Sequence, residues 1–133
     1  MIQRDYIERL IQQAIQGLAQ AVALIRRGEL DPASIIVEKT ADLLLGPLRP
    51  AFERLDPASA VALVRESELD RVRLYAALLA EQGAIQELRG NQPLADYLHR
   101  RALEFYEAGR RAGVHLLPAD LERMAELAGR FQA

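Results

Sequence analysis

The fold is decided by residues 66–90, ESELDRVRLYAALLAEQGAIQELRG. Two mainly apolar rows recur in this stretch at steps of three and four residues, which is the spacing of one face of an α-helix. At about 100° per residue, the two rows lie on roughly opposite sides of one helix over residues 68–90. A helix that is apolar on two sides needs neighbours on two sides, so we expect it to form the middle layer of an all-α domain. One row is Val72, Ala76, Leu79, Gly83 and Gln86, and the other is Leu74, Leu78, Glu81, Ile85 and Leu88.

The composition is that of an ordinary globular chain. Its 133 residues are enough for one domain with a real core, so residues 1–133 are expected to form a single domain. A net charge of −2 provides no basic field that would gather nucleic acid. The absence of cysteine excludes disulfides, thiol catalysis and cysteine-bound zinc. The sequence shows neither a signal-peptide pattern nor a stretch that could span a membrane, so we expect a cytoplasmic protein.

Short turn motifs divide the rest of the chain into helices. The tetrapeptide DPAS begins at Asp31 and again at Asp56, and in it Asp suits the N-cap and Pro suits the first helical position. Ser67 and Asp70 resemble a capping box at the start of the central helix. No strand-like alternation persists, so the sequence predicts antiparallel helical hairpins in an array or bundle of about five to seven helices. The expected helices cover about residues 2–27, 31–45, 57–64, 68–90, 93–113 and 118–130.

Residues on both sides of the break at Gly90 have the spacing of a two-helix repeat. The matching positions are Leu79, Gly83, Gly90, Ala95 and Ala102. On these positions the helix pair resembles a degenerate tetratricopeptide repeat, a family with small residues where its helices cross and a glycine in the turn. The sequence departs from the family at Gln86 and His99, where aromatic residues are favoured, and at Glu107, where proline is favoured. The resemblance implies a helical array that binds other proteins.

The opening residues, MIQRDYIERLIQQ (1–13), carry a second resemblance. They are similar to the start of a group of short bacterial helical proteins that begin Met-Ile-x-Arg-Asp-Tyr-Ile and continue into tetratricopeptide-like helices. This resemblance implies a bacterial source and a helical fold, and it implies no activity.

Three residues are candidates for acid–base or metal chemistry. Glu81 lies within the second apolar row, where a covered carboxylate needs a partner or has a raised pKa; alternatively, a small rotation of the helix brings it to water. Asp96 and His99 are at i, i+3 spacing, which can hold a metal, but ferritin-like centres need Glu-x-x-His and the sequence lacks this pattern. We expect His99 to be a boundary histidine with one hydrogen bond. No catalytic residue, cofactor or metal is predicted, and a metal-binding helical protein is kept as an alternative.

A basic ladder lies on the helix expected over residues 93–113. It consists of Arg100, Arg101, Arg110 and Arg111. Tyr97 projects from the same polar side, and arginine beside an aromatic ring can bind phosphate or stack on a base. Glu104 and Glu107 interleave at i, i+4 spacing, which favours a self-neutralised and solvated face. A nucleic-acid-binding protein that uses this ladder is therefore an alternative to the main prediction.

The main prediction is a non-catalytic protein–protein interaction module, either a tetratricopeptide-like adaptor or a self-associating helical protein that forms a homodimer. It depends on an excess of apolar helix faces over the helices available to cover them. The first helix also carries several glutamines, which cost less to bury against a second chain than charged side chains do; a solvated face is the alternative. Neither a membrane nor nucleic acid is expected as a partner. A possible partner interface comprises Leu74, Leu78, Glu81, Ile85, Gln13, Gln16, Gln20, Tyr97 and Arg101.

Overall fold

The computed structural model describes residues 2–132, so Met1 and Ala133 lie outside the described part. These residues form helices and turns with no strand, which confirms the predicted all-α fold class. The helices are α1 (Ile2–Arg26), α2 (Leu30–Leu45), α3 (Arg49–Arg54), α4 (Pro57–Val61), α5 (Asp70–Leu88), α6 (Gln92–Ala112) and α7 (Pro118–Arg130). Short 3-10 turns, η1 (Gly46–Leu48) and η2 (Glu66–Glu68), precede α3 and α5.

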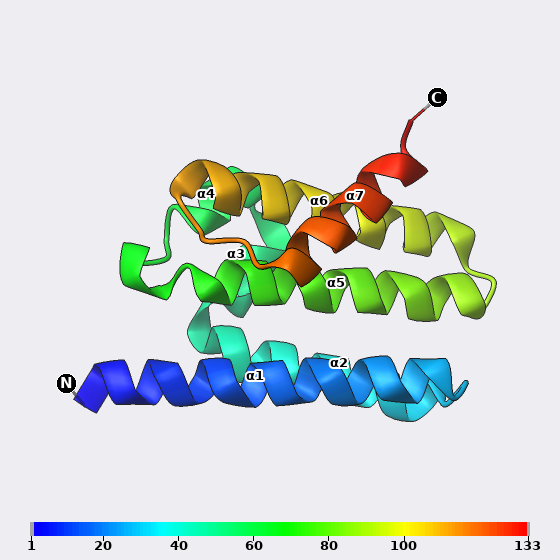
Figure 1. Cartoon of the computed structure of the whole chain (residues 1–133), viewed down its shortest axis with the longest axis horizontal. Coiled ribbons are helices and arrows are strands. Elements are labelled where there is room, and N and C mark those ends of the chain that lie inside the picture. The colour runs from blue at the N-terminus through cyan, green and yellow to red at the C-terminus, as the bar shows by residue number, and fades with distance from the viewer. Residues whose placement is uncertain (1, 133) are drawn as a thin grey trace.

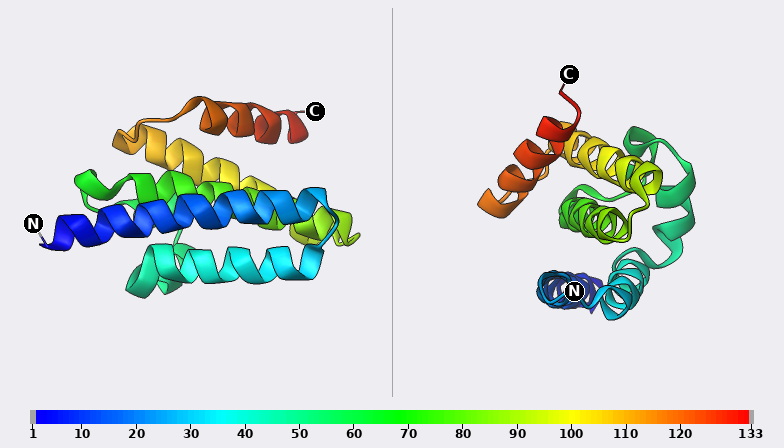
Figure 2. Two further views of the ribbon diagram at one scale, coloured as in Figure 1. Left: turned by 60° about the horizontal axis from the view of Figure 1, so that its bottom comes forward. Right: turned by 90° about the vertical axis from the view of Figure 1, so that its right-hand side faces the viewer.

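Helix α5 lies in the middle of the molecule. The antiparallel pair of α1 and α2 packs on one side of it, and α6 and α7 cover the other side (Figure 1). Seen end-on, α3 and α4 pass beside α5 and connect the α1–α2 pair to the α6 layer (Figure 2, right). Every residue from Arg71 to Leu78 is buried. The prediction of an interior helix with neighbours on two sides is therefore confirmed.

Three aromatic rings fasten α3 to α5 and α6. Phe52 of α3 stacks on Phe105 of α6 with the ring centroids 5.2 Å apart. Tyr75 of α5 meets both rings edge-on, at 5.5 Å from Phe52 and 5.2 Å from Phe105. All three residues are buried, so the short helix α3, which would be marginal alone, is held in place by tertiary packing.

The two DPAS tetrapeptides behave differently. Asp56 is the N-cap of α4 and accepts a hydrogen bond from the backbone N–H of Ser59 at 3.0 Å, as predicted. The prediction that Asp31 is an N-cap is wrong. Helix α2 begins at Leu30, one residue before Asp31, so Asp31 lies inside its first turn. The Asp31 carboxylate instead accepts a hydrogen bond from Arg89, which follows α5. A long-range ion pair has therefore replaced a local cap.

The predicted capping box at the start of α5 is also wrong. Ser67 lies in η2, and α5 begins at Asp70 without a side-chain cap. The Asp70 carboxylate accepts a hydrogen bond from Arg73 at 2.8 Å, one turn further along α5. Asp70 is thereby engaged within the helix that it begins.

Glycines allow α5 and α6 to pack closely as the predicted antiparallel pair. A Cβ atom built on Gly83 of α5 would lie 2.7 Å from the Nδ1 and Cε1 atoms of His99 on α6. A Cβ atom built on Gly109 of α6 would lie 3.1 Å from the Cγ1 atom of Val72 on α5, a tight contact. In the turn between the helices, Gly90 has a φ of +83°, a conformation that favours glycine. The small residues therefore set the distance between the two helices.

Candidate functional site

The apolar row on α5 is not a partner interface. Leu74, Leu78 and Ile85 are 2%, 1% and 0% exposed and belong to the hydrophobic core. The α1–α2 pair and α6 pack on α5 within a single chain. The prediction that a second chain contacts these three residues is wrong, because the helices of one chain already cover them.

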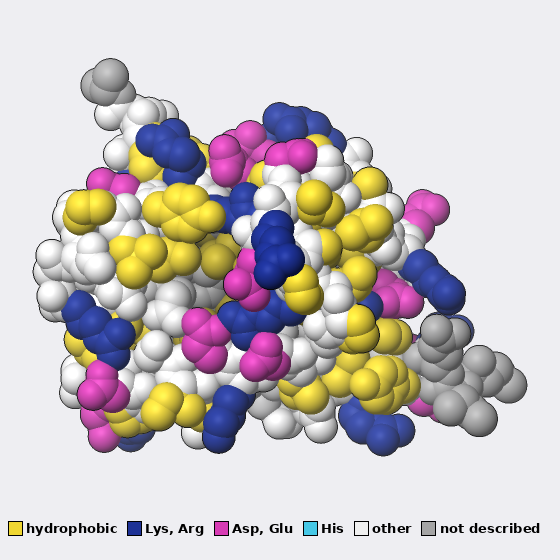
Figure 3. Space-filling model, turned by 180° about the vertical axis from the view of Figure 1, so that it is seen from behind, with side chains coloured by type: hydrophobic (Ala, Val, Ile, Leu, Met, Phe, Trp, Pro, Cys, Tyr) yellow, Lys and Arg dark blue, Asp and Glu magenta, His cyan; other side chains and the backbone are white. Residues whose placement is uncertain are grey.

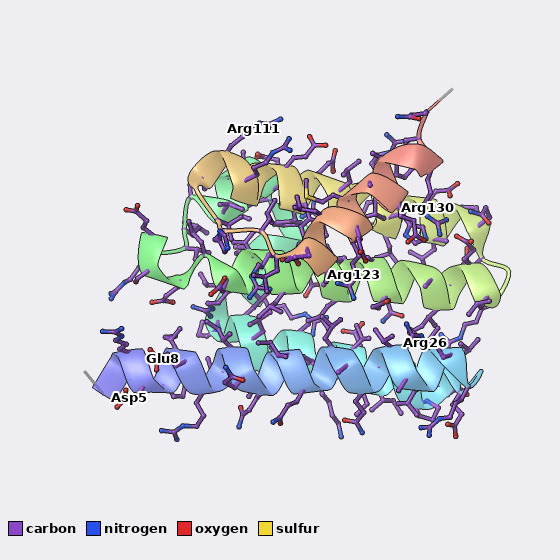
Figure 4. All side chains as sticks on the ribbon, viewed as in Figure 1. Asp5, Glu8, Arg26, Arg111, Arg123 and Arg130 are labelled. Atoms are coloured by element: carbon purple, nitrogen blue, oxygen red, sulfur yellow. The ribbon has the colours of Figure 1, made fainter. Side chains whose placement is uncertain are left out.

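Glu81 is half-buried at the side of α5 that faces the space between α1 and α7. Its carboxylate forms no ion pair with another described residue within 4.0 Å. Burial raises the pKa of the Glu81 carboxyl above its usual value, and the charges of Arg123 and Arg26 offset only part of the shift. Figure 4 shows that these arginines come from α7 and α1, on the two sides of α5. Both sequence interpretations therefore hold in part: the pKa is raised and the side chain still reaches water.

The raised pKa of Glu81 predicts a pH-dependent effect of replacing it. A group whose pKa is higher in the folded state binds more protons there, so its contribution to stability is present at low pH and lost as the pH rises through the folded pKa. We therefore expect Glu81→Gln to be more stable than the wild type at pH 7 and equally stable at pH 4. Urea unfolding at both pH values measures this difference; an equal gain at both would show that charge is not its cause.

Arg101 does not belong to an outward basic ladder. Its Nη2 atom donates hydrogen bonds to the carbonyl oxygens of Phe52 and Leu55 at 2.6 and 2.7 Å, at the end of α3. These carbonyl groups have no partner in the next helical turn because α3 ends there. Arg101 therefore caps α3 through Nη2 alone, and its place in a partner interface stays a prediction. Tyr97, in contrast, is 56% exposed, one turn before Arg101 on α6.

Arg100 and Arg111 have separate contacts, and Arg110 is exposed. Arg100 lies over the ring of Phe131, 4.2 Å from its centroid. Arg111 pairs with Glu107 at 3.6 Å, as the i, i+4 spacing predicted. No ion pair forms between Arg100 and Glu104 within the described residues. The arginines of the ladder therefore differ in their surroundings, and the nucleic-acid alternative stays a prediction.

His99 is a core residue rather than a boundary residue, with 2% of its surface exposed. Its Nε2 atom lies 3.2 Å from a carboxylate oxygen of Glu87, which also accepts a hydrogen bond from Arg130 at 2.6 Å. Burial lowers the pKa of His99, so the imidazole is neutral at pH 7 and its Nε2–H donates to Glu87. Asp96 is turned to Gln92 instead, at 2.7 Å. No three potential metal ligands gather among residues 2–132.

The outer face of α1 carries the glutamines that the sequence predicted as part of a partner interface. It comprises Gln12, Gln13, Ile15, Gln16, Ala19, Gln20 and Ala23, all of them exposed. Helix α1 lies at the edge of the molecule, with the other helices to one side of it (Figure 1). No charged residue occurs between Arg9 and Arg26. The predicted interface residues Gln13, Gln16 and Gln20 are therefore together on one accessible and uncharged helix face.

Comparison of the chain with protein-family models, with curated proteins and with solved structures gives no match. The resemblance of the α5–α6 pair to a tetratricopeptide repeat therefore stays a prediction. None of the described helices combines the length and the apolar character that crossing a membrane requires.

Proposed function

We propose that this chain is a non-catalytic protein–protein interaction module that pairs with a second copy of itself through the outer face of α1. The observation that carries the proposal is the absence of charge from an exposed face, in a chain of which 27% of the residues are charged. Glutamine and alanine cost less to bury than ionised side chains do. In a twofold dimer the same face meets itself, and an uncharged face does so without repulsion.

The ends of α1 favour an antiparallel arrangement of the two copies. Asp5 and Arg26 are both exposed and lie near opposite ends of α1 (Figure 4). Neither forms an ion pair with another described residue. A twofold axis between Ile15 and Gln16 brings Asp5 of each copy level with Arg26 of the other along the helix axis. Opposite charges therefore lie at the same level at both ends of the proposed interface.

The size of the face limits the strength of the association. Helix α1 has 25 residues and, at 1.5 Å per residue, is about 37 Å long. Pairing along one helix of this length buries an area near the low end for specific interfaces, roughly 1,200 Å² in total. We therefore expect a reversible dimer with micromolar affinity.

Adding charge to the outer face of α1 tests the proposal. In the variant Gln16→Glu with Gln20→Glu, four carboxylates meet near the twofold axis, so we expect the dimer dissociation constant to rise at least tenfold, or about 1.4 kcal/mol. Sedimentation equilibrium over a range of protein concentrations measures the constant. The matched control, Ala119→Glu with Ala125→Glu, adds the same charge at exposed positions of α7 and should dimerise like the wild type.

A charge swap tests the orientation of the helices. Asp5→Arg and Arg26→Asp should each weaken the dimer, and the double variant should restore it, because the two residues exchange charge across the interface. A wild-type chain that sediments as a 14.9 kDa monomer at millimolar concentration contradicts the proposal as a whole. A dimer that tolerates both charge substitutions of the outer face uses another surface, which contradicts it as well.

A further inference from the structure

A pocket of about 200 Å³ lies between α2, α3, α5 and α6. Its apolar wall is formed by Val37 and Ala41 of α2, Leu78 and Leu79 of α5, and Leu98 of α6. Figure 3 shows the back of the molecule, where basic and acidic side chains stand beside a hollow with hydrophobic side chains around it. Pockets for drug-sized ligands have roughly 300–1,000 Å³, so this pocket suits a smaller molecule.

One end of the pocket has an excess of negative charge. The Arg49 guanidinium of α3 pairs with Glu38, with Asp42 at 2.6 Å and with Glu53 at 3.1 Å. Three carboxylates around one guanidinium leave net negative charge. Glu38 and Glu53 line the pocket, so the surplus is available to a bound cation.

The other end has a positive charge that no carboxylate of the described residues pairs with. Arg101 lines the pocket, and its hydrogen bonds go to the backbone carbonyl oxygens of Phe52 and Leu55, both from Nη2. No carboxylate of the described residues lies within 4.0 Å of its guanidinium. The Nε and Nη1 hydrogens are thus free to donate, and the charge is available to a bound anion.

Tyr75 lies between the two ends. It is 4% exposed, it lines the pocket, and its hydroxyl forms no hydrogen bond with another described residue. The charges of Arg49, Arg101, Glu53 and Glu38 all act on it, and burial raises the pKa of Tyr75 to about 12. The hydroxyl therefore stays protonated at neutral pH. The hydroxyl is reached by solvent through the pocket, so water or a ligand there can accept its hydrogen bond.

We infer that this pocket binds a small zwitterion with an aliphatic body, of the class of a free amino acid. Its carboxylate accepts hydrogen bonds from Arg101 and Tyr75, its ammonium lies against Glu53 and Glu38, and its aliphatic part packs on the leucines. A molecule with a single charge would contact only one of the two charged ends. A zwitterion satisfies both ends. This inference is independent of the proposed pairing through α1, which does not line the pocket.

Three probes of similar shape test the need for both charges. L-leucine carries both groups, isopentylamine lacks the carboxylate, and 4-methylpentanoate lacks the ammonium. In calorimetric titrations of the full chain, we expect leucine to bind and each analogue to bind at least tenfold more weakly. Absence of leucine binding at millimolar concentration overturns the inference. An analogue that binds as tightly as leucine also overturns it, because one charged end is then sufficient.

A conservative variant tests the position of the ligand. Tyr75→Phe keeps the ring contacts with Phe52 and Phe105 and removes only the hydroxyl, so the fold should persist. We expect leucine binding to weaken roughly tenfold through loss of one hydrogen bond to a charged group. Tyr6→Phe is the control, since Tyr6 is an exposed residue of α1 away from the pocket. Unchanged leucine binding by a folded Tyr75→Phe variant places the ligand elsewhere and contradicts the inference.

Discussion

Arg71→Met is expected to lower the free energy of unfolding by about 4 kcal/mol, within the range for removing one partner of a buried ion pair. Arg71 of α5 is 8% exposed. It donates to the carbonyl oxygens of Leu44 and Leu45 at 2.9 and 3.0 Å, and it pairs with Glu68 at 2.7 Å. Both carbonyl groups belong to the last turn of α2, which has no further helical N–H to bind them. Methionine keeps the bulk of the side chain and leaves two carbonyl groups and a carboxylate without their donor.

Two comparison variants separate these contributions in urea unfolding experiments. Arg4→Met also removes an arginine–glutamate pair, but that pair is exposed, so the change should stay within about 0.5 kcal/mol. The double variant Glu68→Gln with Arg71→Met removes the unpaired carboxylate and should recover part of the loss. A stability of Arg71→Met equal to that of Arg4→Met would mean that Arg71 does not join α2 to α5.

The position of α5 was predictable because its signal is local. Two rows at helical spacing, one through Val72 and one through Leu74, require neighbours on two sides wherever those neighbours lie in the sequence. The start of α4 was predictable for the same reason, since Asp56 is the N-cap and accepts a hydrogen bond from the backbone N–H of Ser59, three positions away. Asp31 has the same local sequence, yet its carboxylate binds Arg89, which lies 58 residues further along the chain.

The roles of the arginines were not predictable from the sequence. Arg71, Arg101 and Arg111 look alike in a helical pattern, but Arg111 pairs with a residue of its own helix, whereas Arg71 and Arg101 bind carbonyl groups of other helices. Backbone carbonyl groups have no side-chain signature, so such partners become visible only in the fold. The pocket residues Tyr75 and Arg49 were missed for a related reason: they come from different helices, and no spacing within one helix relates them.

The candidate interface was predictable only in part. The glutamines of α1 stand out because no charge interrupts the helix between Arg9 and Arg26, and the structure leaves their face open. Leu74 and Ile85 belong to an apolar row whose cover the sequence does not identify. Identifying that cover requires knowing how α1 and α2 pack on α5, which no periodicity within α5 can provide.

The second large effect on stability is expected from a substitution where α5 and α6 cross. Gly83→Val is expected to lower the free energy of unfolding by about 3 kcal/mol, at the upper end for overpacking a core. The new Cβ would lie 2.7 Å from ring atoms of His99, and that ring is buried and bound to Glu87. Either the ring gives up this hydrogen bond or the two helices move apart. Gly129→Val is the control, because nothing lies within 4 Å of a Cβ at this position of α7, and it should change stability by about 0.5 kcal/mol or less.

A double-mutant cycle shows whether the contact between Gly83 and His99 is the cause. His99→Ala alone should cost about 2 kcal/mol, since it leaves a cavity and removes the hydrogen bond to Glu87. In Gly83→Val with His99→Ala, the valine fills the space that the imidazole left, so the double variant should be about 2 kcal/mol more stable than the sum of the single changes predicts. Additive losses would mean that the valine is accommodated by a shift of the α5 backbone. The glycine would then not be what allows these two helices to approach so closely.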